Sequence, residues 1–250
     1  FYEVHQIAHR VQQEAYGAAP QTPGRLSRLE SSERRVLGAA DGLVVLTGPL
    51  AQAVRSLGPL QGSVVVVPDA VDPAAFLAPG PSPARPLTVG YVGQLYPWKG
   101  VDVLLEALVL APSWRGLIVG GMPQEPADRL RLEAKARVLG LESRVAFRSF
   151  VPPREVPEIY CEMHATALPL PDTVMGREYT SPLKLFEALA AGCPIVASDL
   201  PTIRELLKDS ETGLLVPPGD PGALAAALER LAADEGLRRR LGEAGRREAA

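Results

Sequence analysis

The sequence has few cysteines and no long apolar run. Cys161 and Cys193 are the two cysteines among 250 residues. Their spacing matches neither a metal-binding motif nor a disulfide framework, which is typical of a reducing compartment, so we expect a cytoplasmic protein. No hydrophobic run approaches the roughly 18 residues that a membrane-spanning helix requires, and the sequence therefore predicts no such helix.

Lysine is also scarce, and the sequence carries no basic excess. Lys and Arg together number 26 against 29 Asp and Glu, which gives a formal net charge of -3. This balance provides no long-range attraction for nucleic acid, so an anionic ligand has to be bound by local groups. The positions of the few lysines therefore indicate where an anion binds. They are Lys99, Lys135, Lys184 and Lys208.

Several common catalytic motifs are missing. The sequence contains no Gly-x-Ser-x-Gly, which argues against nucleophilic hydrolysis of the α/β-hydrolase type. His5 and His9 have the spacing of two ligands on a helix, but FYEVH is typical of a strand and no third ligand follows, so we predict no metal site. We interpret Cys161 and His164 as packing and surface residues rather than as a catalytic pair.

What the sequence does contain is a regular alternation of strand-like and helix-like segments. This alternation predicts an α/β fold with parallel strands. Runs that are apolar nearly throughout are typical of strands that helices cover on both faces. The nine strand-like runs lie at residues 1–5, 42–47, 63–68, 87–93, 116–121, 144–150, 165–170, 194–198 and 213–218.

A proline-rich segment, PDAVDPAAFLAPGPSPARP, divides these runs into groups of three and six. Dense proline without periodicity is typical of a linker. We therefore predict a partial N-terminal domain at residues 1–68, a linker at 69–86 and a C-terminal domain with a complete Rossmann-type layer at 87–250. Because the chain opens on FYEVH, without a methionine or a targeting pattern, we expect a fragment or a processed product.

The first candidate site lies in REYTSPLKLFEALAAGCPIVASD, residues 177–199. Ser181 and Pro182 are typical of a helix cap and a first helical position. The backbone N–H groups of Leu183 and Lys184 would then be free to bind an anion. Lys184 adds a positive charge in the first turn, where it opposes the helix dipole and costs a few tenths of a kcal/mol or more. This cost favours a binding role for the lysine.

Glu187 lies one turn further along the same predicted helix. Two interpretations are equally compatible with its position. It is either a solvated side chain that pairs with Lys184 at a spacing of three, a contact worth about 0.2 to 0.5 kcal/mol, or a carboxylate that binds a polar ligand.

The second candidate site is VGYVGQLYPWKGVDVLLEAL, residues 89–108. Gly93 ends a predicted strand, Gln94 begins the loop, and Lys99 precedes the next helix. A glycine at the strand end lets backbone approach a ligand, and a lysine offers a point charge to phosphate. The spacing matches neither a dinucleotide fingerprint nor a nucleoside-triphosphate loop. Both candidate sites follow strands of a parallel sheet, at the edge where such sheets bind ligands.

Five segments together resemble a known family. GYVGQLYPWKGVDVLLEAL, SPLKLFEALAAGCPIVASD and ETGLLVPPGD, with DGLVVLT and VVVVPDAVD upstream, resemble retaining glycosyltransferases of family 4, the glycosyl transferases group 1, which have the GT-B fold. The resemblance implies that a Rossmann-like C-terminal domain binds a nucleotide-diphospho-sugar donor across a cleft from an N-terminal domain that holds the acceptor. It implies a retaining transfer and no cofactor, since the sugar nucleotide is a co-substrate.

The resemblance also implies roles for individual residues. Lys99 would contact the diphosphate, Leu183 and Lys184 would donate main-chain N–H groups to phosphate, and Glu187 would bind the ribose hydroxyls. His5 would lie near the transferred sugar; its alternative is a core histidine at the end of a strand. The implied catalytic residues are His5, Lys99 and Glu178, and the implied donor-binding residues are Gly93, Gln94, Lys99, Ser181, Leu183, Lys184 and Glu187.

Two positions depart from the family pattern. Gln94 stands where the family usually has an arginine, which removes one phosphate-facing cation. The glutamate pair of the family is separated by seven residues, whereas Glu178 and Glu187 enclose eight and Tyr179 holds the matching place. A contact between Glu178 and the sugar would therefore require a looser loop.

The residues of the candidate sites predict an enzyme that works without a metal. No Asp-x-Asp pair is present, and fixed N–H groups with lysines can stabilise the negative charge of a leaving diphosphate. The alternative function is a nucleotide-sugar-binding remnant without turnover. The sequence does not distinguish between a sugar, a lipid and a small molecule as the acceptor. A further expectation is peripheral membrane contact through a missing N-terminal part.

Overall fold

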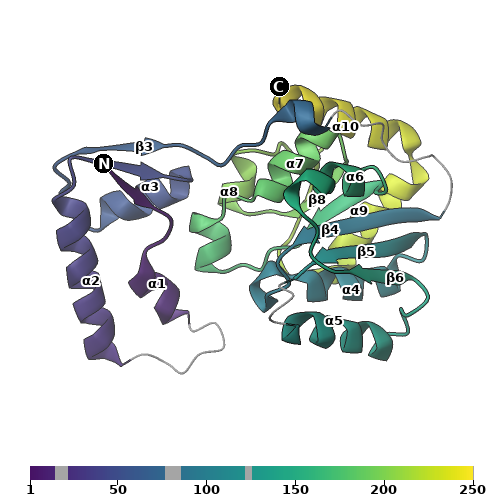
Figure 1. Cartoon of the computed structure of the whole chain (residues 1–250), viewed down its shortest axis with the longest axis horizontal. Coiled ribbons are helices and arrows are strands. Elements are labelled where there is room, and N and C mark those ends of the chain that lie inside the picture. Colours follow the sequence, from purple (N-terminus) through teal and green to yellow (C-terminus); the bar gives the residue numbers. More distant parts are fainter. Residues whose placement is uncertain (15–21, 77–85, 122–125, 250) are drawn as a thin grey trace. The chain divides into compact units, whose positions relative to one another are not determined.

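A computed structural model describes residues 1–14, 22–76, 86–121 and 126–249 (Figure 1). The chain divides into two compact units. The first comprises Phe1–Asp69 with two later segments, Asp172–Pro182 and Leu200–Leu206, and the second comprises Ala70–Pro171, Leu183–Asp199 and Leu207–Ala250. The expected linker at 69–86 falls partly outside the described residues, at 77–85.

The first unit is built on a three-stranded parallel sheet in the order β1-β2-β3. Valine-rich runs form the strands, as β-branched side chains favour the extended backbone. In the central strand, Leu43 is in register with Tyr2 on one side and Val64 on the other. The elements before residue 70 are β1 (Tyr2–Val4), α1 (Ala8–Gln13), α2 (Pro23–Gly38), β2 (Gly42–Val45), α3 (Gly48–Ser56) and β3 (Ser63–Val66).

Two later segments of the chain also belong to the first unit. They contain η4 (Met175–Tyr179), which is a π-helix, and α8 (Pro201–Arg204). Tyr179 packs in the hydrophobic core of this unit, and the hydroxyl of Thr202 donates to the carbonyl oxygen of Gly176 at 2.6 Å. The predicted boundary at residue 87 places both segments in the C-terminal domain, because contacts between segments so distant along the chain leave no periodic pattern in the sequence.

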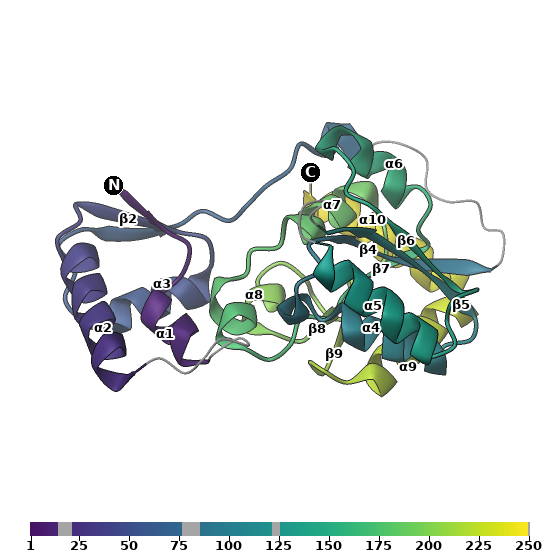
Figure 2. The same ribbon diagram turned by 60° about the horizontal axis from the view of Figure 1, so that its bottom comes forward.

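The second unit contains a six-stranded parallel sheet in the order β6-β5-β4-β7-β8-β9. Helices α4, α5 and α9 lie on one face of the sheet and α6, α7 and α10 on the other, as Figures 1 and 2 both show. The strands are β4 (Leu87–Gly93), β5 (Trp114–Gly120), β6 (Val145–Arg148), β7 (Ala165–Leu168), β8 (Ile195–Ser198) and β9 (Leu214–Val216). The helices are α4 (Val101–Leu110), α5 (Ala127–Val138), α6 (Val156–Tyr160), α7 (Leu183–Ala191), α9 (Pro221–Ala233) and α10 (Glu235–Ala249), with single 3-10 turns η1 (Pro73–Phe76), η2 (Pro97–Lys99) and η3 (Pro153–Glu155).

The strand order of this sheet determines where a ligand can bind. In order of appearance the strands lie 3-2-1-4-5-6, which is the doubly wound Rossmann arrangement. After β4 the chain adds β5 and β6 on one side, and it then returns to add β7, β8 and β9 on the other side. The strand order therefore reverses between β4 and β7, which are neighbours in the sheet. Ligands of such sheets bind at the carboxyl ends of these two strands, where the connections leave a crevice.

The predicted secondary structure is largely confirmed. All nine strand-like runs contain a strand. In the structure Thr47 and Asp220 cap α3 and α9 by accepting from the N–H groups of Leu50 and Ala223. The start predicted for α7 was wrong by one residue, because Leu183 and not Pro182 is its first helical residue. Among the described residues, no helix combines the length and the apolar character needed to cross a membrane.

Candidate functional site

The loop after β4 presents Lys99 on a short, rigid turn. Its backbone N–H donates to the carbonyl oxygen of Tyr96 at 2.9 Å, which closes the 3-10 turn η2. The rings of Tyr96 and Trp98 stack with their centroids 4.6 Å apart. The loop holds the ammonium group of Lys99 in a partly desolvated position, and this burial lowers its pKa.

Gly100 joins this loop to α4 and requires glycine for two reasons. Its φ of +73° lies in the left-handed region, and a Cβ atom there would collide with the carbonyl oxygen of Pro169, just after β7. Gly140 has a similar φ of +69° with no atom within 4 Å of such a Cβ. The loop that carries Lys99 therefore packs directly against the end of the neighbouring strand.

We expect Gly100→Ala to lower the free energy of unfolding by about 3 kcal/mol or more, since it combines backbone strain with a backbone collision. Gly140→Ala, the matched control, adds the strain without the collision and should cost about 1 to 2 kcal/mol. Urea unfolding of both variants measures the difference. Equal losses would show that the close approach of Pro169 to Gly100 is absent.

Lys184, in the first turn of α7, reaches the end of β4. Its Nζ atom lies 3.3 Å from Tyr91 Oη and 4.9 Å from the centroid of the Tyr91 ring. A Cβ atom on Gly93 would lie 3.0 Å from the same Nζ, so a larger residue at the strand end would crowd the lysine. The Tyr91 hydroxyl donates to the carbonyl oxygen of Gln94 at 2.7 Å and is therefore free to accept from Lys184. Tyr91 thus connects the two candidate segments.

The charge of Lys184 is poorly compensated in the free protein. Burial and, to a smaller extent, the nearby charge of Lys99 lower its pKa to about 7, although the charge of Glu187 acts in the opposite direction. The ion pair between Lys184 and Glu187, one of the two interpretations of the sequence, is not found, although both residues are described. In the described part of the chain, Lys99 has no ion-pair partner either. Two lysines whose positive charges repel each other give this edge of the sheet the electrostatics of an anion-binding site.

Glu187 is held by Tyr160 instead of Lys184. The Tyr160 hydroxyl lies 3.3 Å from Glu187 Oε2 and 3.1 Å from the carbonyl oxygen of Lys184. Burial raises the pKa of Glu187, while the bond from Tyr160 and the charge of Lys184 lower it. The interpretation of Glu187 as a solvated surface side chain was therefore wrong.

The first turn of α7 adds backbone donors to this group. The first N–H groups of a helix have no acceptor within the helix, and α7 begins at Leu183. Leu183, the first residue of α7, is 48% exposed. Gly93, Gln94, Lys99, Leu183, Lys184 and Glu187 therefore all lie at the carboxyl edge of the second sheet, as the sequence predicted.

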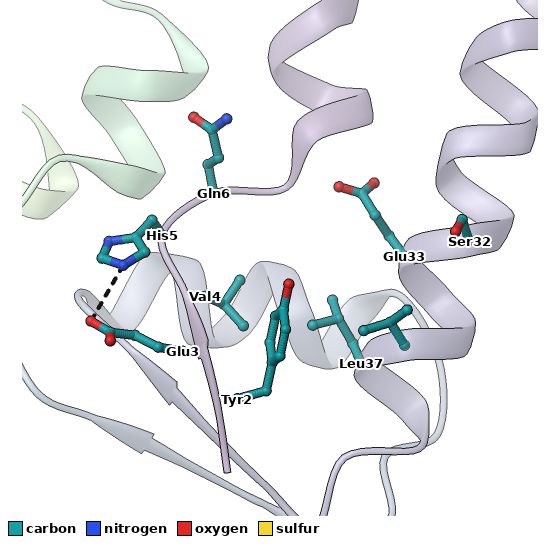
Figure 3. A pocket seen from close by; sticks show the side chains of 9 residues that line it. Tyr2, Glu3, Val4, His5, Gln6, Ser32, Glu33 and Leu37 are labelled. Carbon is teal, nitrogen blue, oxygen red and sulfur yellow. Dashed lines mark ion pairs between the residues drawn. The ribbon is translucent and has the colours of Figure 1, made fainter.

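Ser181, Glu178 and His5 belong to the first unit. The hydroxyl of Ser181 accepts a hydrogen bond from the backbone N–H of Asp69 at 3.0 Å, a contact that the sequence did not indicate. His5 is 64% exposed, with Nε2 3.3 Å from Glu3 Oε1, and it lines a pocket of about 300 Å³ between β1 and α2 (Figure 3). The interpretation of His5 as a core histidine was wrong.

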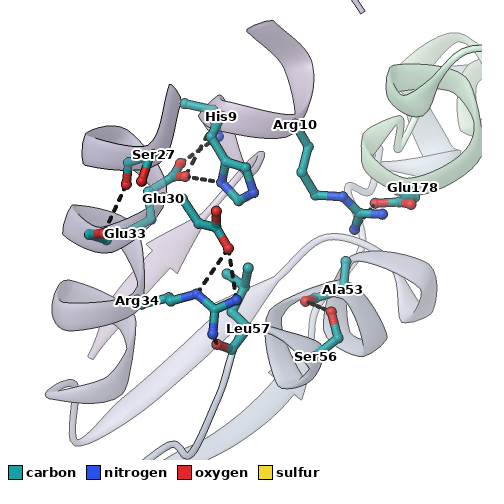
Figure 4. Close-up of polar contacts among 12 residues, drawn as sticks. His9, Arg10, Ser27, Glu30, Glu33, Arg34, Ala53, Ser56, Leu57 and Glu178 are labelled. Carbon is teal, nitrogen blue, oxygen red and sulfur yellow. Dashed lines mark hydrogen bonds and ion pairs between the residues drawn. The ribbon is translucent and has the colours of Figure 1, made fainter. Parts of the chain in front are cut away.

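Glu178 is bound to an arginine within the first unit. Its Oε2 atom accepts from Arg10 at 2.8 Å (Figure 4), and its carbonyl oxygen accepts from the hydroxyl of Thr47. The segment is a π-helix in which the N–H of Thr180 donates to the carbonyl oxygen of Met175 at 3.0 Å. A π-turn holds one residue more than an α-turn. The segment with one residue more than the family spacing therefore begins at the widened turn Met175–Tyr179. Tyr179, which stands where the family has its first glutamate, is buried in the core.

Sequence reasoning missed Tyr91, Tyr160 and Arg10. Tyr91 had a detectable signal, because it lies two residues before Gly93 on the same strand and so faces the same side of the sheet. Tyr160 and Arg10 reach their partners through contacts between distant segments, which no local pattern reveals. Within the described residues, no group of three His, Cys, Asp or Glu side chains is arranged to hold a metal ion.

Comparisons with known proteins agree with this geometry. The family model described as Glycosyl transferases group 1 matches residues 76–248. The chain belongs to this family. A D-inositol 3-phosphate glycosyltransferase of Xylanimonas cellulosilytica is 33% identical to this family member over 243 residues, which are 91% of this chain and 56% of that protein. The exopolysaccharide phosphotransferase SCO2592 of Streptomyces coelicolor is 36% identical over 211 residues, 82% of this chain and 21% of that protein.

Solved structures of glycosyltransferases share the fold. Sucrose-phosphate synthase from Thermosynechococcus elongatus superposes with a TM-score of 0.80 at 27% identity and covers 99% of this chain and 62% of its own. Anabaena HepE in complex with UDP-glucose gives a TM-score of 0.79 at 21% identity over 99% of this chain and 66% of its own. The predicted GT-B type α/β fold is thereby confirmed. This glycosyl transferases group 1 chain spans about half the length of the D-inositol 3-phosphate glycosyltransferases that it matches.

Proposed function

We propose that the second unit binds the nucleoside-diphosphate sugar donor of a family 4 glycosyltransferase, which transfers the sugar with retained anomeric configuration. The observation that carries the proposal is the pair Lys99 and Lys184: two desolvated lysines without an ion-pair partner in the described chain, at the switch point of a Rossmann-type sheet. A diphosphate supplies the charge that this pair lacks.

Each remaining residue of the edge has a role in this proposal. Lys99 and Lys184 bind the diphosphate, the first backbone N–H groups of α7 bind the phosphate nearest to them, and Glu187 accepts hydrogen bonds from the ribose hydroxyls. Gly93 leaves room for the ligand beside Lys184. These contacts strengthen as the diphosphate leaves the anomeric carbon and its negative charge grows, which is how fixed donors lower the barrier.

The proposal extends to a transfer that requires no divalent cation, because the lysines and N–H groups themselves stabilise the leaving group. Glu178 and His5 are proposed to contact the transferred sugar. For the acceptor we propose a small hydroxylated molecule; inositol 3-phosphate is the first to test, as several relatives carry that name.

A thermal-shift screen tests donor binding. The isolated chain is heated with UDP, GDP, ADP and their glucose conjugates, each with magnesium and with EDTA. We expect at least one diphosphate to raise the melting temperature by a few degrees in both conditions, since a ligand at about 100 times its Kd stabilises by about 2.7 kcal/mol. A folded chain that none of them stabilises would contradict the donor site, and stabilisation in magnesium alone would contradict metal independence.

Turnover separates an enzyme from a binding module. A chain that binds the donor and releases the nucleoside diphosphate when an acceptor is added is a transferase, and the anomeric proton coupling of the product reports retention. Donor binding without release in the presence of any offered acceptor would favour the alternative, a binding module.

A further inference from the structure

We propose that Tyr160 is a positioning residue, which orients the Glu187 carboxylate so that it discriminates the ribose of the donor from deoxyribose. This inference rests on the proposed function, which assigns Glu187 to the ribose. Nothing in the sequence pointed to Tyr160, which lies at the end of α6, on the face of the sheet that α7 also covers.

One phenolic hydroxyl touches both parts of α7 that form the site. Tyr160 Oη lies 3.3 Å from Glu187 Oε2 and 3.1 Å from the carbonyl oxygen of Lys184. The phenol has one proton and both partners are acceptors, so the proton is shared between them in a three-centre hydrogen bond that ties the carboxylate to the first turn of α7. A side chain that is held at both its base and its tip has few orientations left, which is the condition for selective recognition.

The Tyr160 ring is itself immobile. The residue is 1% exposed, and Phe76 packs against it edge to face, with the ring centroids 6.1 Å apart and an angle of 66° between the planes. A tyrosine has two side-chain torsions, and burial of the ring fixes both. The hydroxyl therefore occupies one position relative to α7, and it can act as a fixed reference for Glu187.

The protonation states are compatible with this role. Burial raises the pKa of Tyr160 well above its usual value, so the phenol keeps its proton and can donate. The same kind of desolvation raises the pKa of Glu187, and the Tyr160 bond partly reverses that rise. Lys184 Nζ contacts Tyr91 rather than Glu187. Tyr160 is consequently the side chain that donates to Glu187, and its hydrogen bond acts with the charge of Lys184 to favour the ionised carboxylate, the form that accepts from two neighbouring hydroxyls.

Tyr160→Phe tests the inference, because phenylalanine preserves the ring and its packing on Phe76 while it removes the hydroxyl. In the ligand-free chain, the carbon-13 carboxyl resonance of Glu187, assigned by its loss in Glu187→Gln, should titrate at a higher pH in the variant. In calorimetric titrations, the preference for UDP over 2′-deoxy-UDP and 3′-deoxy-UDP should fall about 3- to 10-fold, the effect of one lost hydrogen bond.

Tyr91→Phe is the matched control. It removes a buried phenol that contacts Lys184 instead of Glu187. It should weaken the binding of UDP and both deoxy analogues by a similar factor, so that the ribose preference stays at the wild-type value. Circular dichroism melts of both variants should resemble that of the wild type, which checks that the fold is intact.

The outcomes separate the inference from the proposed function on which it rests. If Glu187→Gln abolishes the ribose preference and Tyr160→Phe leaves both the preference and the Glu187 titration unchanged, the positioning role is overturned and the donor site stands. If the wild-type chain binds UDP and the deoxy analogues equally well, the ribose role of Glu187 is overturned together with the inference. If it binds none of them, both proposals fall.

Discussion

Lys184→Met should weaken the binding of UDP about 10- to 100-fold, because a contact between an ammonium group and a phosphate is worth about 1.5 to 3 kcal/mol when it is lost. The same substitution should leave the melting temperature unchanged or raise it. In the ligand-free chain the lysine is a desolvated charge with a pKa lowered to about 7, and methionine has a similar length without the charge. Calorimetry measures the first effect and thermal unfolding the second.

The pH dependence of this variant follows from the same shift in pKa. The unfolded chain binds a proton at Lys184 up to about pH 10.4, whereas the folded chain releases it near pH 7. The destabilisation by Lys184 is therefore complete below pH 7 and disappears as the pH rises towards the pKa of the unfolded state. The advantage of Lys184→Met in stability should be largest at pH 6 and vanish in strongly alkaline solution.

Lys208→Met is the control for Lys184→Met. The Lys208 side chain is 62% exposed and lies 3.8 Å from Glu248, which is a surface ion pair of little energetic weight. Its replacement should change neither UDP affinity nor the pH dependence of stability. Equal UDP affinity of wild type and Lys184→Met would contradict the phosphate role of Lys184, whatever the stability data show.

Binding of UDP should be accompanied by proton uptake at pH 8. At this pH most Lys184 side chains are neutral in the ligand-free chain, since their pKa lies near 7, and a diphosphate beside the amine favours its charged form. At pH 6 the amine is already charged, so its contribution to uptake should disappear. Affinity should fall as the pH rises above 7, because the proton then has to be taken from solution.

Titration calorimetry in two buffers measures this uptake. The apparent binding enthalpy at pH 8 should differ between phosphate and Tris buffers, whose ionisation enthalpies differ, and in Lys184→Met the difference should shrink. Burial also lowers the pKa of Lys99, so proton uptake by Lys99 would account for any difference in enthalpy between the buffers that persists in the variant. The same enthalpy in both buffers at pH 8 would show that the lysines are fully charged before the diphosphate arrives.

Most of the sheet could be predicted from the sequence. Its strands are short valine- and leucine-rich runs bounded by glycine and proline, and such local patterns directly reflect the extended backbone. The placement of Gly93, Lys99 and Lys184 at one edge followed from the parallel topology alone. What the topology could not provide is the partner of each charge.

Those partners depend on contacts between segments that are distant in the chain. Tyr91 and Lys184 are 93 residues apart, Tyr160 and Glu187 are 27 apart, and Arg10 and Glu178 are 168 apart. The spacing of Lys184 and Glu187 within one helix was equally compatible with an ion pair between them and with a ligand-binding carboxylate. Packing excludes the ion pair, because the buried tyrosines Tyr91 and Tyr160 offer both side chains a partner that the surface of an isolated helix lacks.

The segment around Glu178 shows a second limit of the sequence. Counting residues between the two glutamates gave one too many, which made Tyr179 the residue at the matching place. The structure buries Tyr179 in the core and forms a π-helix over Met175–Tyr179. Sequence spacing assumes a regular helical or extended backbone, so it cannot anticipate a turn that takes up an additional residue.

The location of the bound diphosphate tests the central claim most directly. Amide proton–nitrogen spectra of the isotope-labelled chain are recorded during a titration with UDP. The account predicts that the largest shifts belong to the backbone amides of Gly93, Gln94, Leu183 and Lys184, at the ends of β4 and the start of α7. Saturable shifts confined to other elements, such as α9 and α10, would contradict it.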